Sequence, residues 1–134
     1  MFLFLKLAAA ALVSMLVIDS VWLRTMYEPL YKKNIGHLLG ESVQYAPAVF
    51  FYLLYIGGLT FLVLYPGVTS GASLGTIALR GAVFGMAAYA TYDLTSQAVL
   101  RDWPTSVTII DIIWGTLLTG AISGISVYLI RLVA

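Results

Sequence analysis

Three aspartates, Asp19, Asp93 and Asp111, lie inside stretches of the chain that carry almost no other charge. A carboxyl group in such surroundings can act as a general acid or base, carry protons, or anchor the polar end of a ligand. An ionisable group inside a membrane span is costly, so it usually faces the interior of a helix bundle and is a functional candidate by default. A structural role is the alternative: Asp19 as a solvated helix end, and Asp111 as a packing contact near the interface.

Aromatic and polar side chains share helical faces with these aspartates. Trp22 and Trp114 each follow an aspartate by three residues, and Tyr89 precedes Asp93 by four. Residues three or four apart on a helix lie on the same face. We therefore predict one ligand-binding cavity, with no assigned catalytic residue, lined by Asp19, Trp22, Tyr52, Tyr55, Tyr89, Tyr92, Asp93, Thr95, Asp111 and Trp114.

The composition indicates which elements position these residues. Of the 134 residues, 61% are hydrophobic and only 10% are charged. A soluble domain carries about a quarter charged residues, and a chain this short cannot bury so much apolar surface in water. The net charge of +1 argues against a nucleic-acid partner. With no cysteine and one histidine, we predict no metal site and no cofactor.

Four membrane-spanning helices account for the apolar stretches. About 20 residues of helix cross the roughly 30 Å of hydrocarbon, and we predict spans at residues 2–23, 46–65, 74–100 and 105–130. The first is retained rather than cleaved, because no small-x-small site follows it. Residues 25–42 are predicted as a short amphipathic helix in the interface, and 66–73 and 101–104 as tight turns. The fold class is an all-α, four-helix integral membrane bundle, with 1–134 as a single transmembrane domain.

Successive spans alternate in direction, which places all three aspartates in the same half of the membrane. The same reasoning places Tyr52 and Tyr55 toward that side. Three neighbouring carboxyls cannot all be ionised in a low dielectric, so at least one is expected to hold a proton. Arg24 lies at the same end and is the expected counter-ion, whereas Arg80 is expected to snorkel to the opposite interface.

Glycines four residues apart occur three times, as Gly71 with Gly75, Gly81 with Gly85, and Gly120 with Gly124. Such spacing lets two helix backbones approach closely. We favour packing within one bundle over a dimer face, and a homo-oligomer through these faces stays open.

The motif from Tyr89 to Thr95, YATYDLT, resembles a family of small, uncharacterised bacterial inner-membrane proteins catalogued as a domain of unknown function. The resemblance covers nearly the whole chain and includes Asp19-x-x-Trp22, Tyr52-x-x-Tyr55 with Gly57, Trp103-Pro104, and Asp111-x-x-Trp114-Gly115. Members usually continue the central motif with Asn, where this chain has Ser96. The resemblance implies a four-span bundle and a multi-pass location in the bacterial inner membrane, and it implies no reaction.

These observations support several functions. The leading hypothesis is a binding protein that holds a small amphipathic or lipid-like molecule in the aspartate-tyrosine-tryptophan cavity, with membrane lipids as its surroundings and Asp93 as the main polar anchor. An enzyme that uses a protonated aspartate as general acid or base on a lipid is an alternative. Proton-coupled transport and a non-catalytic assembly subunit are further alternatives. Basic residues divide almost evenly between the two sides, so they do not set the orientation.

Overall fold

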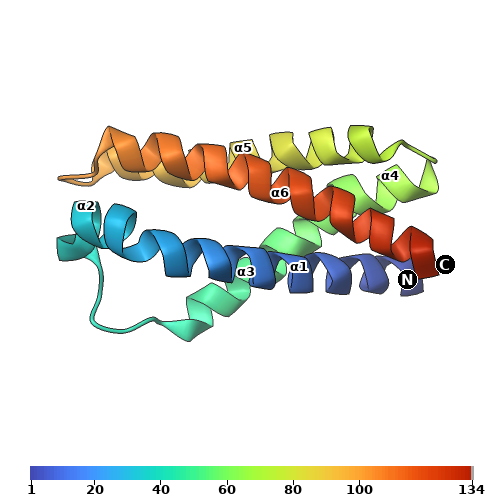
Figure 1. Cartoon of the computed structure of the whole chain (residues 1–134), viewed down its shortest axis with the longest axis horizontal. Helices are drawn as coiled ribbons and strands as arrows, with labels where there is room; N and C mark the ends of the chain where they lie inside the picture. The colour runs from blue at the N-terminus through green and yellow to red at the C-terminus, as the bar shows by residue number, and fades with distance from the viewer. Residues whose placement is uncertain (134) are drawn as a thin grey trace.

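The chain is all-helical in the computed structural model, which describes residues 1–133, and no strand occurs among them (Figure 1). Four helical stretches are long and apolar enough to cross a membrane: Phe2–Leu38, Tyr45–Thr69, Leu74–Val99 and Thr105–Val133. The predicted class, an all-α bundle with four candidate spans, is confirmed. The elements in chain order are α1 (Phe2–Met26), η1 (Tyr27–Lys32), α2 (Lys33–Ile35), η2 (Gly36–Leu38), α3 (Tyr45–Leu59), η3 (Thr60–Leu64), α4 (Tyr65–Thr69), α5 (Leu74–Val99) and α6 (Thr105–Val133).

Two of these elements, η1 and η3, are π-helical turns, and each is associated with a proline. Pro29 lies within η1, and Pro66 lies two residues after η3 ends. Proline has no N–H to donate, and its ring collides with the carbonyl four residues earlier. A wider turn relieves that collision and lets the helix continue.

The prediction of a tight turn over residues 66–73 is therefore wrong in its first part, since the helix runs on through α4 to Thr69 before the turn at 70–73. The first helix also continues past residue 23, through η1, α2 and η2, without a non-helical residue before Leu39. The placement of residues 25–42 in the membrane interface stays a prediction. His37 in this segment lies 3.5 Å from the Asp102 carboxylate in the turn between α5 and α6.

Helices α5 and α6 form the closest pair in the bundle, lying side by side along their length (Figure 1). Gly81 and Gly85 face α6 so tightly that a Cβ at either position would overlap α6 atoms. On α6, a Cβ at Gly120 would lie 3.2 Å from the Ala78 carbonyl oxygen of α5. The packing interpretation of these glycines is confirmed. Gly71 serves a turn instead, with a φ of +72°.

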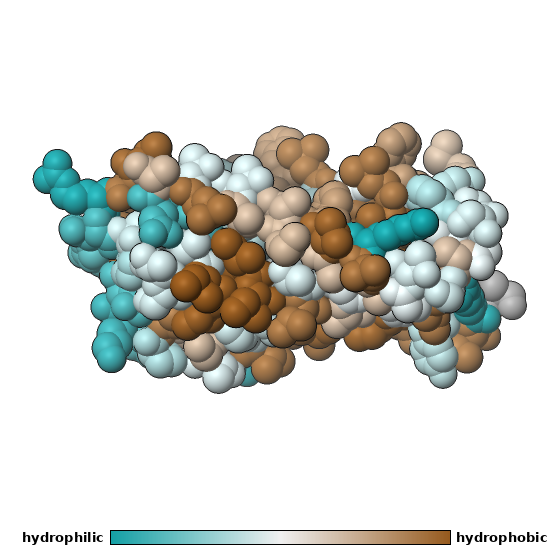
Figure 2. Space-filling view, turned by 90° about the horizontal axis from the view of Figure 1, so that it is seen from above, coloured by the Kyte–Doolittle hydropathy of each residue, from teal (hydrophilic) through white to brown (hydrophobic). Residues whose placement is uncertain are grey.

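Helix α3 is placed differently from the other three long helices. Helix α1 packs on α6, and η3 contacts α1, α5 and α6, which closes the bundle at that end. The first half of α3 diverges from α5 and α6, so its N-terminal end lies apart in Figure 1. The outer surface is largely apolar, and hydrophilic residues gather at the end that holds α2 and the turn between α5 and α6 (Figure 2). The divergence of α3 leaves space beside α5 in the membrane half that contains the aspartates.

Candidate functional site

Asp19, Asp93 and Asp111, called the acidic cluster below, lie in the same half of the bundle. They come from the C-terminal part of α1, the C-terminal part of α5 and the N-terminal part of α6. All three are buried, with 9%, 0% and 7% of their surface exposed. Asp19 is therefore not a solvated helix end, which was the alternative to a functional role for this residue.

Two aromatic donors hold the Asp19 carboxylate. The Trp114 Nε1–H donates to Oδ1 at 3.1 Å, and the Tyr52 hydroxyl donates to Oδ2 at 3.2 Å. These bonds join α1 to α6 and to α3. Because both oxygens have a donor, burial of Asp19 carries no unpaired polar atom.

A second set of bonds links Asp111 to the helical extension of α1. The Tyr31 hydroxyl of η1 donates to Asp111 Oδ1 at 2.6 Å and accepts the Trp22 Nε1–H at 3.0 Å. Trp22 in turn stacks on Trp114, with ring centroids 4.2 Å apart and an angle of 7° between the rings. The stack joins the Asp111 network to the Asp19 network.

Tyr31 is a site residue that the sequence reasoning missed. Residues 25–42, which include Tyr31, are predicted from the sequence as an amphipathic helix whose apolar face lies in the membrane interface. The π turn around Pro29 extends the first helix and directs this face back over the bundle. Leu30 and Ile35 from the same segment are buried against Val107 of α6, which holds Tyr31 in place.

Asp93 has no comparable set of donors. It is fully buried, and neither of its carboxyl oxygens has a hydrogen-bond donor among the described residues. The Asp111 carboxyl lies beside it. Two adjacent buried carboxylates repel each other, and one proton shared between them converts that repulsion into a hydrogen bond.

The remaining predicted residues are divided between the interior and the outer surface. Tyr55 bonds Thr119 at 2.5 Å, and the Tyr89 ring packs over Gly115 and lies edge-on to Tyr55. Tyr92 is 60% exposed and rests edge-on against Trp103. Thr95 is exposed on the outer face of α5, and the structure does not bring it to the site.

The expected counter-ion, Arg24, does not reach the acidic cluster. Arg24 lies five residues after Asp19, which turns it away from the inward face of α1, and it is exposed. The ion pairs among residues 1–133 are Lys32 with Glu28 and His37 with Asp102, so none involves the cluster. The expectation that Arg24 balances the cluster is wrong.

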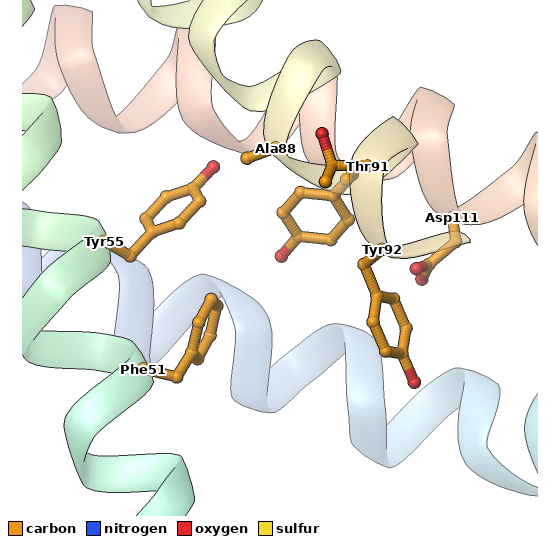
Figure 3. Close-up of a pocket in the computed structure, with 7 residues that line it drawn as sticks. Phe51, Tyr55, Ala88, Thr91, Tyr92 and Asp111 are labelled. Atoms are coloured by element: carbon orange, nitrogen blue, oxygen red, sulfur yellow. The ribbon is translucent and has the colours of Figure 1, made fainter. Parts of the chain in front are cut away.

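A cavity of about 490 Å³ lies between the diverging α3 and α5, with α6 behind it. Figure 3 shows Phe51 and Tyr55 on one side of this space and Tyr92 and Asp111 on the other. The exposed rings of Phe51 and Tyr92 mark its opening on the outer surface. Its surface is mostly aromatic and apolar, with a few polar groups. The residues that line it are Phe51, Tyr55, Ala88, Tyr89, Thr91, Tyr92 and Asp111.

The cavity includes only part of the predicted lining. Asp111 reaches its wall, whereas Asp93 is sealed behind it and Asp19 is held in the neighbouring network. Phe51 and Thr91 line the cavity and were not predicted. A second hollow, of about 580 Å³, shares Phe51 and Tyr55 with the first and continues along α3 past Leu54. Among residues 1–133, no group of three or more His, Cys, Asp or Glu is placed to hold a metal ion.

The fold and site define a multi-pass α-helical membrane protein with an acidic, aromatic-lined cavity in one membrane half. The model of the family described as predicted membrane protein (DUF2177) matches residues 4–128, so the chain belongs to that family. No curated protein and no solved structure matches the chain.

Proposed function

We propose that this protein is a membrane-embedded binding protein for a small amphipathic or lipid-like molecule. The observation that carries the proposal is the cavity between α3 and α5, which is open at its side and has the Asp111 carboxyl in its wall. Ligand pockets of this size are usually mostly apolar with a few placed polar groups. We also propose the bacterial inner membrane as its location, on the basis of the motif resemblance.

The apolar part of such a ligand fits the side of the cavity that α3 forms. The neighbouring hollow along α3 is lined by Pro47, Phe50, Phe51, Leu54 and Tyr55, all of which an alkyl chain can contact. The polar part fits the opposite side, where the Asp111 carboxyl and the Thr91 and Tyr92 hydroxyl-bearing side chains lie. Asp111 therefore replaces Asp93 as the proposed polar anchor.

The polar residues in the other membrane half do not favour a proton path. Ser123 and Ser126 are fully buried on α6, yet their hydroxyls donate to the carbonyls of Thr119 and Ile122 on the same helix. Thr60 donates to the Ile56 carbonyl in the same way. Each of these three hydroxyls therefore donates within its own helix and not toward the acidic cluster.

A substitution that fills the cavity tests the proposal. Ala88 lines the cavity, whereas Ala87, its neighbour on α5, is exposed on the outer surface. We expect native mass spectrometry of the detergent-released protein to show a bound molecule that Ala88→Phe removes and Ala87→Phe retains. A bare chain in the parent, or equal retention in both variants, would refute a specific site in this cavity.

A further inference from the structure

The acidic cluster has no balancing positive charge among residues 1–133. Neither ion pair of the described residues touches it, and the cavity lining contains Asp111 but no Lys, Arg or His. A buried carboxylate without a counter-ion is unfavourable unless it is protonated or a cation is supplied from elsewhere.

Asp93 provides the second observation. Its carboxyl is fully buried and directed at Asp111, and both oxygens lack a donor among the described residues. One proton on Asp93 donates to Asp111 and leaves the pair with a single negative charge. Asp111 then accepts hydrogen bonds from Asp93 and Tyr31, and its carboxyl is the member of the pair that lines the cavity.

We infer that the ligand is a cationic amphiphile, with an ammonium head against Asp111 and an alkyl part along α3. This inference rests on the proposed function and adds the charge of the head group. Tyr89 and Tyr92 border the same space, and aromatic faces attract ammonium groups. Phosphate and carboxylate head groups do not fit, because they would place a second negative charge beside Asp111. The cavity lining has no Lys, Arg or His that could balance this charge.

The test compares head groups on one alkyl chain. The full chain is reconstituted in phosphatidylcholine nanodiscs, whose zwitterionic surface avoids general attraction of cations, and titrated with dodecyltrimethylammonium, dodecanol and dodecyl phosphate against empty nanodiscs. We expect the ammonium to bind about tenfold or more tightly than the alcohol, because the buried carboxylate attracts the positive head group in surroundings of low dielectric. Asp111→Asn should remove the preference for the ammonium over the alcohol. Asp102→Asn, at an exposed aspartate in the α5–α6 turn, should retain it.

The outcomes separate the two proposals. Binding of dodecanol with no tighter binding of the ammonium, or tightest binding of the phosphate, would overturn the cationic ligand and leave the binding function standing. Equal head-group preference in the parent and in Asp111→Asn would overturn the role of Asp111. No binding above empty nanodiscs would overturn the proposed function itself. If Asp111→Asn does not fold, the comparison of the three head groups on the parent protein still decides the inference.

Discussion

Removal of one hydroxyl, in Tyr31→Phe, tests whether η1 is fastened to the bundle through the site. The hydroxyl donates to Asp111 at 2.6 Å and accepts from Trp22 at 3.0 Å, so the substitution removes one hydrogen bond from each partner. A hydrogen bond to a charged group contributes about 1.5–3 kcal/mol in proteins generally. Between membrane helices the measured average is nearer to about 0.6 kcal/mol. With two bonds lost, we expect a destabilisation of about 1–3 kcal/mol.

The assay is reversible unfolding in mixed micelles, with Tyr27→Phe as the matched control. Tyr27 lies in the same π turn, is 45% exposed and bonds no described side chain, so its variant should stay close to the parent. A double-mutant cycle with Asp111→Leu isolates the Tyr31–Asp111 contact, and we expect a coupling of about 1 kcal/mol. A loss below about 0.5 kcal/mol in Tyr31→Phe, together with no coupling, would refute the fastening role.

Two further predictions concern packing. Gly115→Ala places a Cβ against the Tyr89 ring and should destabilise the protein by about 1–3 kcal/mol, the usual range for overpacking. As the control, a Cβ at Gly57 meets nothing within 4 Å, so Gly57→Ala should be neutral or stabilising in the same unfolding assay. Equal effects of the two would contradict the close α5–α6 contact. The Trp22–Trp114 stack should produce an exciton couplet in far-ultraviolet circular dichroism, and Trp22→Phe should abolish it. A parent spectrum with no couplet, or one unchanged in the variant, would contradict the stacking.

The grouping of the aspartates could be predicted because it follows from helix length and alternation alone. Once four spans are assigned, Asp19, Asp93 and Asp111 must lie in one membrane half, whatever the details of packing. The inward direction of Trp22 and Trp114 follows from spacings of three residues. Periodicity argues against Thr95, which lies two residues after Asp93 and is rotated toward the opposite face.

The contacts of η1 could not be predicted from an ideal helical repeat. A π turn changes the number of residues per turn, so the side-chain directions that follow Pro29 are offset from those that precede it. Tyr31 therefore reaches Asp111 although it lies 80 residues away in the chain. The distinction between Asp111 at the cavity wall and Asp93 behind it also depends on how α3, α5 and α6 diverge, which sequence periodicity does not specify.

The π turn η3 gives α3 the geometry of a lever. The bundle is closed at η3, and the 15 residues of α3 extend about 22 Å from it toward the free end at Tyr45. A tilt of about 10° at η3 would therefore move the Tyr45 end by about 4 Å, while Leu59 stays packed. A small change in the angle of α3 at η3 would therefore change the width of the cavity mouth. We expect spin labels at the exposed positions Tyr45 and Val99 to report a narrower distance distribution when the cavity is filled; an unchanged distribution would show that α3 is rigid.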